Sequence, residues 1–295
     1  MPNLYQERSS NLMRTWILMI GFFLVVIALG FLIAQYYGDP SILYIAVAIA
    51  IAMNVGSYWF SDKLVLSMTG AKPASREEFF DLYTVTENLA ITAGLPMPKL
   101  YVINDPAPNA FATGRDEKHA VVAATTGLLS VLDRTELEGV IAHELSHIKN
   151  RDMLVMTVAV VLAGFVAIIA DIFLRMSMVG GNRDNDRGGA LLAVLAIVGV
   201  ILAPIAAQLI QLAISRRREY LADASGALLT RYPEGLASAL RKISSYGAPM
   251  KRANTATAHL FISNPFGPRM KGITNLFATH PPVEDRIRRL TGSSE

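Results

Sequence analysis

Four long apolar stretches constrain this chain more than any other feature of its sequence. They cover residues 16–34, 42–59, 153–174 and 190–214. Each has the roughly 17–25 residues that a helix needs to cross a hydrocarbon core of about 30 Å. The composition agrees, because 52% of the residues are hydrophobic and only 17% are charged, whereas soluble domains average about 25% charged residues. The sequence therefore predicts a mainly α-helical membrane protein with four transmembrane helices.

The third and fourth stretches leave an alternative open. Asp171 interrupts the third, and the fourth contains Pro204, Gln208 and Gln211. Polar groups cost free energy in lipid unless they face protein. These two stretches are therefore also compatible with buried helices of a soluble domain, or with a hairpin that enters the membrane without crossing it.

The placement of lysine and arginine predicts the orientation. The segment 60–152 has nine such residues and the segment 215–295 has thirteen, whereas the loop at 35–41 has none. Because positively charged segments are retained on the cytoplasmic side, we expect both termini inside. The chain then divides into an N-terminal tail with two transmembrane helices (1–59), a cytoplasmic segment (60–152), two further transmembrane helices with an external loop (153–214), and a second cytoplasmic segment (215–295).

The two cytoplasmic segments are together large enough for one compact domain, and their pattern predicts an α+β fold with a small sheet. A Ser-x-x-Glu capping box at 75–78 predicts a helix that runs to about Ala93, where Gly94 stops it. Short strands are expected at 99–103, 110–113 and 120–124, followed by a short helix at 126–132. A second capping box, at 135–138, predicts the start of the helix that carries the chemistry.

That helix contains the motif H-E-x-x-H at residues 143–147. Side chains four positions apart project from the same face of a helix, so His143 and His147 are placed to bind one tetrahedral ion together. The chain has no cysteine, which excludes thiolate ligands and leaves imidazoles and carboxylates. The predicted cofactor is one Zn²⁺ per chain. Glu144 lies beside such a site and suits a general base that acts on a water molecule.

A catalytic zinc usually has three protein ligands and one open position. No third histidine follows at the close spacing of some zinc proteases, and Glu219 and Asp223 stand four residues apart on another predicted helix. In one interpretation Glu219 is the third ligand and Asp223 orients a ligating imidazole. In the other, Glu219 is a surface partner of the three arginines that precede it. Spacing alone leaves both open.

Taken together, the motifs resemble those of a known family. The H-E-x-x-H motif followed far downstream by E-x-x-x-D is similar to the gluzincin arrangement, and the four apolar stretches extend the likeness to HtpX-type integral-membrane zinc metalloproteases, relatives of the type I CAAX prenyl proteases. The further segments that match this family are N-A-F-A-T-G at 109–114, T-H-P-P at 279–282, and Arg286.

This resemblance implies a membrane-anchored zinc endopeptidase in which His143, His147 and Glu219 hold the metal and Asp223 stands behind them. It also implies quality control of damaged or misfolded membrane proteins and a role in stress response. We therefore expect a multi-pass protein of the bacterial cytoplasmic (inner) membrane whose active site faces the cytoplasm. The expected partners are the lipid bilayer and misfolded membrane-protein substrates.

Two further site predictions remain open. His280 is a candidate donor to the oxyanion of a tetrahedral intermediate; the alternative is an ordinary histidine ahead of two prolines. Residues 109–113 are a candidate exposed edge strand that binds substrate by strand addition; the alternative is an ordinary sheet edge or loop without that role. The candidate substrate-binding residues of this strand are Asn109, Ala110, Phe111 and Ala112.

Other classes of function fit less well. A net charge of +3 over 295 residues gives no footprint for nucleic acid, and no phosphate-binding glycine-rich loop points to ATP. A membrane scaffold with a structural zinc has no use for Glu144. A metal transporter would carry its ligands within the apolar stretches. The sequence does not indicate an oligomeric state.

Overall fold

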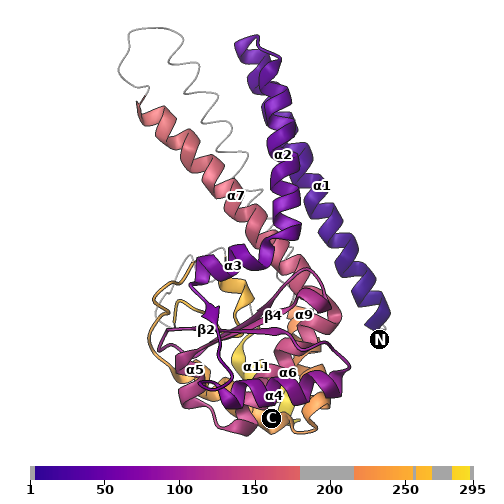
Figure 1. Cartoon of the computed structure of the whole chain (residues 1–295), viewed down its shortest axis with the longest axis vertical. Coiled ribbons are helices and arrows are strands. Elements are labelled where there is room, and N and C mark those ends of the chain that lie inside the picture. Colours follow the sequence, from indigo (N-terminus) through magenta and orange to yellow (C-terminus); the bar gives the residue numbers. More distant parts are fainter. Residues whose placement is uncertain (1–3, 180–215, 255–256, 268–280, 293–295) are drawn as a thin grey trace.

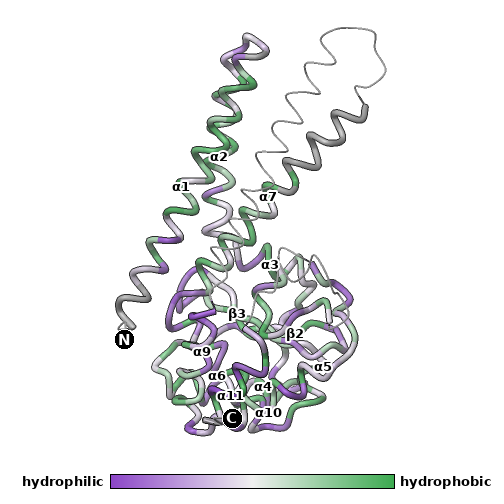
Figure 2. The backbone as a smooth tube through the Cα atoms, turned by 180° about the vertical axis from the view of Figure 1, so that it is seen from behind, coloured by the Kyte–Doolittle hydropathy of each residue, from purple (hydrophilic) through white to green (hydrophobic). Residues whose placement is uncertain are grey.

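The computed structural model describes residues 4–179, 216–254, 257–267 and 281–292. Long apolar helices rise from a domain that contains a sheet (Figure 1). These helices are α1 (Leu4–Tyr37), α2 (Ser41–Trp59) and α7 (Asp152–Val179). Hydrophobic residues run along α1 and α2, whereas the domain alternates between hydrophilic and hydrophobic segments (Figure 2).

The helices α1 and α2 form an antiparallel hairpin whose turn contains Gly38 at a φ of +68°. Two stretches, Ser9–Gln35 and Ser41–Trp59, are long and apolar enough to cross a membrane. Only 33% and 22% of their apolar windows are buried, so most of the surface of these two stretches is not covered by the described part of the chain. The first two predicted spans therefore have matching helices.

The other two predicted spans fare differently. The third corresponds to α7, of which Asp152–Val166 is a shorter apolar helix. The fourth, at 190–214, lies outside the described residues, as does most of the loop that precedes it. The structure thus supports a mainly helical chain with two candidate membrane spans, and leaves the prediction of four transmembrane helices without confirmation.

The domain has the predicted small sheet, with strand order β1-β2-β4-β3. The strands are β1 (Lys72–Pro73), β2 (Lys99–Ile103), β3 (Ala110–Thr113) and β4 (Val121–Thr125). The two central strands, β2 and β4, are parallel, and each outer strand pairs antiparallel with its neighbour. The sheet is therefore mixed, and β3 forms one of its edges.

Side chains alternate between the two faces of the sheet along β4, and both faces are covered. Val122 and Ala124 pack into a core with α4 (Phe80–Ala93), α6 (Arg134–Asn150) and α10 (Pro233–Ser245). Val121 and Ala123 point to the opposite face, into a core with α3 (Ser61–Thr69) and the first turns of α7. The remaining helices are α5 (Thr126–Val131), α9 (Arg216–Thr230) and α11 (Val283–Thr291), with short 3₁₀ turns at Glu117–His119 and Ala258–Leu260.

The first predicted capping box forms only in part. The Ser75 hydroxyl accepts a hydrogen bond from the Glu78 amide at 3.2 Å, but the chain makes a turn there and α4 begins at Phe80. The predicted end of this helix is confirmed, because Gly94 closes it in the left-handed conformation at a φ of 69°.

The second capping box was predicted two residues too late. The residues that form it are Asp133 and Glu136, and Glu136 also binds Ser238 at 2.7 Å and Lys242 at 2.6 Å. Glu138 is instead half-buried beside Arg134. Tertiary contacts with α10 therefore select the register of the helix start.

Candidate metal centre and active site

The helix α6 presents both histidines of the H-E-x-x-H motif on its buried face. The Nε2 atoms of His143 and His147 lie 3.1 Å apart, and both side chains are almost fully buried. The helix ends after Asn150, where Arg151 adopts a φ of 59° and turns the chain into α7. This pair is the arrangement that the spacing predicts.

Glu219 of α9 faces the same two nitrogens. Its carboxylate oxygens lie 3.8 Å from His143 Nε2 and 3.6 Å from His147 Nε2. Ligands bound to one tetrahedral zinc ion at about 2.0–2.2 Å stand about 3.3–3.5 Å from one another. The two imidazoles and the carboxylate, whose candidate ligand atoms all lie within 4.8 Å, therefore fit a single metal ion, and Glu219 is buried rather than at the surface.

Glu219 reaches the histidines because α9 packs closely against α6. The buried face of α9 includes Glu219, Ala222, Asp223 and Gly226, which recur at helical spacing. A Cβ atom at Gly226 would lie 3.0 Å from the backbone nitrogen of His143. The absence of a side chain at this glycine lets the two backbones approach, and this approach sets the reach of the carboxylate.

A carboxylate stands behind each imidazole. Asp223 Oδ1 lies 2.9 Å from His143 Nδ1, as the predicted orienting role requires. Asp152 Oδ2 lies 3.0 Å from His147 Nδ1, and this contact was not predicted from the sequence. Outer carboxylates of this kind fix the tautomer and the orientation of a ligating histidine.

Asp223 is itself held by Arg286 of α11. The guanidinium donates to both carboxylate oxygens, at 2.8 Å and 2.7 Å, and also to the Ile262 carbonyl at 3.0 Å. Burial alone would raise the pKa of Asp223, but Arg286 and His143 lower it to about 2. Asp223 is therefore ionised, and its negative charge is shared between a guanidinium and an imidazole.

The two histidines differ in their proton affinity. Burial lowers the pKa of His143. Burial acts on His147 in the same direction, but the Asp152 and Glu219 carboxylates outweigh it and raise its pKa to about 9. Without an ion, the site thus holds one neutral and one protonated imidazole at neutral pH.

Glu144 is buried next to this cluster, with 1% of its surface exposed. Burial raises its pKa to about 7, and the nearby Glu219 charge adds to this rise, whereas His147, Arg286 and the backbone amide of Ala112 oppose it. A carboxyl group with a pKa near neutrality can both take up and release a proton at physiological pH.

Comparison with known proteins agrees with this geometry. The profile of Peptidase family M48 matches residues 76–294, which include both halves of the candidate site. The chain belongs to peptidase family M48. It is accordingly a metallopeptidase, and the HtpX-type resemblance expected from its motifs is confirmed by its relatives.

A protein called "Protease HtpX homolog" from Caldanaerobacter subterraneus subsp. tengcongensis is 48% identical over 294 residues, covering 97% of both chains. One of the same description from Pyrococcus furiosus is 51% identical over 279 residues, covering 94% of both. The solved structure described as "Crystal Structure of S. mikatae Ste24p" has a TM-score of 0.51 at 16% identity and covers 97% of this chain and 67% of that one. This structural likeness concerns the fold.

In this M48 chain, the candidate substrate strand β3 lies at the sheet edge, as expected. It is not exposed: all four of its residues are buried, and the Ala110 carbonyl already accepts a hydrogen bond from the Ile262 amide at 2.9 Å. The residue alternation of an antiparallel pair directs the Ala112 backbone away from β4, toward the Glu144 carboxyl group, whose pKa the Ala112 amide lowers. The β3 edge is therefore covered at Ala110 and meets the candidate base at Ala112.

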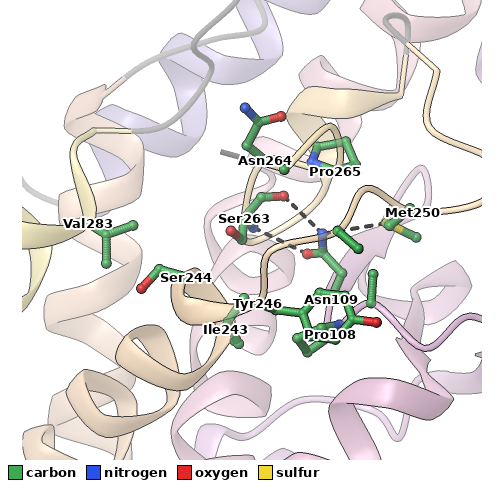
Figure 3. A pocket seen from close by; sticks show the side chains of 13 residues that line it. Pro108, Asn109, Ile243, Ser244, Tyr246, Met250, Ser263, Asn264, Pro265 and Val283 are labelled. Atoms are coloured by element: carbon green, nitrogen blue, oxygen red, sulfur yellow. Dashed lines mark hydrogen bonds between the residues drawn. The ribbon is translucent and has the colours of Figure 1, made fainter. Parts of the chain in front are cut away.

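Asn109 has a structural partner at the start of this strand. Its side chain donates to the Ser263 carbonyl at 2.9 Å and accepts from the Ser263 amide at 3.2 Å. These bonds cross one end of a pocket that is also lined by Tyr246, Met250 and Val283 (Figure 3). Neither His143 nor Glu144 lines this pocket.

His280, the candidate oxyanion donor, lies outside the described residues. The sequence-based reasoning also missed one residue of the site, Asp152. The sequence does show an aspartate five positions after the second histidine. This aspartate lies beyond the end of the helix, so helical spacing does not relate it to the histidine.

Proposed function

We propose that this metallopeptidase is a membrane-anchored zinc endopeptidase that hydrolyses peptide bonds of damaged or misfolded membrane proteins on the cytoplasmic side of a bacterial inner membrane. Such an activity would serve membrane protein quality control and stress response. The observation that carries the hydrolytic part is the convergence of His143, His147 and Glu219 beside the buried Glu144. The apolar hairpin of α1 and α2 supports the membrane location.

One zinc ion per chain would be held by the two Nε2 atoms and by the Glu219 carboxylate. Two imidazoles and a carboxylate are a donor set that catalytic zinc sites use. When bound, the ion supplies Lewis acidity, which polarises the scissile carbonyl and makes a water molecule more acidic. Asp223 and Asp152 keep the two rings turned toward the ion.

Glu144 is proposed as the general base and acid. It takes a proton from the attacking water and delivers it to the nitrogen of the leaving amine when the peptide bond breaks. Its burial keeps the carboxyl group poised near neutrality, with a pKa of about 7. His280 is proposed as a donor to the oxyanion of the tetrahedral intermediate.

An extended substrate is proposed to pair with the edge of β3. Because the Ala112 amide is near enough to Glu144 to lower its pKa, a peptide that pairs along this edge would bring its own backbone next to the base. Recognition through backbone groups tolerates many sequences, which suits an enzyme that acts on misfolded proteins. Of the four predicted substrate-binding residues, we propose this direct role for Ala112 and a supporting role for Asn109, Ala110 and Phe111.

The test is cleavage of a denatured membrane protein by the purified full-length chain, measured together with its zinc content. We expect Glu144→Gln to retain zinc and to lose cleavage by a factor of about 10² or more, because the proton transfer is lost. A matched control is Glu138→Gln on the exposed side of the same helix, which should cleave as the wild type does.

Two results would contradict the proposal. Undiminished cleavage by Glu144→Gln removes the glutamate from the chemistry. A wild-type chain that binds zinc but cleaves no denatured membrane protein favours the alternative of a scaffold with a structural metal.

A further inference from the structure

The N-terminal part of α1 reaches past the membrane hairpin to the domain (Figure 1), and one polar residue there contacts the α6–α7 joint. The Asn11 side-chain amide donates to the Asn150 carbonyl at 3.1 Å and to Asp152 Oδ1 at 3.4 Å. Asn11 is 1% exposed and Asp152 is fully buried. The amide thus holds both the last carbonyl of α6 and the first carboxylate of α7.

Asp152 is shared between this amide and the metal centre. One carboxylate oxygen accepts from Asn11, and the other lies 3.0 Å from His147 Nδ1. A continuous chain of contacts therefore runs from Asn11 through Asp152 to His147. A carboxylate fixed on both sides has less freedom to rotate, and the imidazole behind which it stands is correspondingly better oriented.

The alternative of packing alone does not explain an asparagine at this position. Burial of a carboxamide costs free energy unless the group is hydrogen-bonded, and farther along α1, beyond the buried Thr15, the positions that face the helix bundle are apolar, such as Leu18 and Phe22. A leucine at position 11 would bury more apolar area. The two acceptors account for the side-chain nitrogen of Asn11, whereas its Oδ1 atom is buried without a hydrogen-bond partner in the described part of the chain.

We infer that Asn11 is a positioning residue of the metal centre: it orients Asp152 and thereby His147, which makes the membrane helix α1 a part of the centre. This inference rests on the proposed function in so far as His147 is a metal ligand. Asn11 touches neither substrate nor metal, so its effect is on metal affinity and on ligand geometry.

The test measures zinc affinity of the full-length chain in detergent, by competition with a chelator, and the visible spectrum of the Co²⁺-loaded protein. Loss of an outer partner of a ligating histidine costs about 10–100-fold in metal affinity. Asn11 contacts that outer partner and not the histidine itself. We therefore expect Asn11→Leu to lower the zinc affinity by a factor near the lower end of this range and to shift the Co²⁺ spectrum.

The variant Asn11→Asp keeps the size of the side chain and places a carboxylate against Asp152. It should bind zinc more weakly than Asn11→Leu, and it tests the inference if the leucine variant fails to fold. The matched control is Thr15→Val, one turn along α1, because Thr15 is also buried and its hydroxyl bonds within its own helix, to the Asn11 carbonyl. This control should bind zinc and Co²⁺ as the wild type does.

A double variant separates positioning from general destabilisation. If Asn11 acts through Asp152, Asn11→Leu should cause no further loss of zinc affinity in an Asp152→Ala background. Equal losses in both backgrounds, or an unchanged affinity and spectrum in both Asn11 variants, would overturn the inference.

Because zinc affinity is read without a substrate, the two proposals can fail separately. A chain that cleaves nothing but whose zinc affinity depends on Asn11 overturns the proposed function and supports this inference. If the chain cleaves in a zinc-dependent way but its zinc affinity does not depend on Asn11, this inference is overturned and the proposed function stands.

Discussion

The two imidazoles of the metal centre have opposite pKa shifts. Burial lowers the pKa of His143, and the charges of His147 and Arg286 lower it further, whereas nearby carboxylates outweigh burial at His147. Asp223 stands behind His143, but Arg286 neutralises much of its charge and itself disfavours protonation of that ring. Asp152 stands behind His147, with the uncharged Asn11 amide on its other oxygen. The pKa of His143 is therefore lowered and that of His147 is raised.

This asymmetry predicts proton release when the metal binds. At pH 8 the ion-free site should have a protonated His147, with a pKa of about 9, and an ionised Glu144, with a pKa of about 7. A zinc ligand must be a neutral imidazole, so uptake should release about one proton, and affinity should rise about tenfold per pH unit up to about pH 9. Titration calorimetry in buffers of different ionisation enthalpy measures this release.

A binding heat that is the same in every buffer at pH 8 would contradict this prediction, because it would mean that His147 is already neutral. The matched comparison is Asp152→Asn, which removes one of the charges that raise the pKa of His147 and should release less than one proton.

Helix spacing predicted which site residues share a face, whereas the assignment of Glu219 to the metal came from the family resemblance. His143 with His147, and Glu219 with Asp223, repeat at four-residue spacing, and each pair does share a face. Asp152 was missed because its meeting with His147 depends on a left-handed residue, Arg151 at a φ of 59°. Arginine has no preference for that conformation, so the local sequence does not indicate the turn.

Among the elements, α6 is the central helix of the domain, because α4, α9 and α10 all pack against it. Its crossings with two of these helices are made close by glycine. A Cβ atom at Gly139 would lie 2.6 Å from the Leu236 nitrogen, and one at Gly226 would lie 3.0 Å from the His143 nitrogen. The backbone positions of α9 and α10 are therefore set by residues that have no side chain.

A larger residue at Gly226 should push α9 away from the histidines. We expect Gly226→Val to lower zinc affinity, since Glu219 lies two turns away on the same helix, and to cost about 1–3 kcal/mol of stability, as overpacking typically does. Chelator competition and thermal unfolding measure the two effects. Gly164→Ala on α7 is the control, because nothing lies within 4 Å of its added Cβ atom.

Zinc affinity equal to that of the wild type in the Gly226→Val protein would show that α9 can shift without loss of the ligand. The account of the close helix crossing would then be wrong.

At this scale the sequence predicted elements well where local signals were strong. The strand Lys99–Ile103 has the predicted bounds and the end of α4 at Gly94 was placed correctly. The start of α6 was misplaced because two overlapping boxes compete, and contacts of Glu136 with α10 favour the earlier one. The helix α3 was not predicted, and it packs through Val65 and Leu66 on the sheet.

For the whole molecule, the apolar helices and the domain are joined by packing as well as by the chain. Met153 and Met156 at the start of α7 belong to the cores on the two faces of the sheet. The hydroxyl groups of Thr113 in β3 and Thr157 in α7 lie 2.9 Å apart. A side-chain contact thus joins the candidate substrate strand to the helix that continues toward the proposed membrane region.

The proposed orientation can be tested by labelling, because the chain has no cysteine of its own. A cysteine introduced at Asp39, in the turn of the hairpin, should react with a membrane-impermeant maleimide added to intact cells. One introduced at Lys118, on the surface of the domain, should react only after the membrane is permeabilised. The reverse pattern would place the domain and the metal centre outside the cytoplasm.

The most direct test of the account is the position of the metal itself, from anomalous scattering at the zinc edge in crystals of the zinc-loaded protein. We expect one peak per chain, about 2.0–2.2 Å from His143 Nε2, His147 Nε2 and one carboxylate oxygen of Glu219. A peak held by other residues, or one to which Glu219 contributes no ligand, would contradict it.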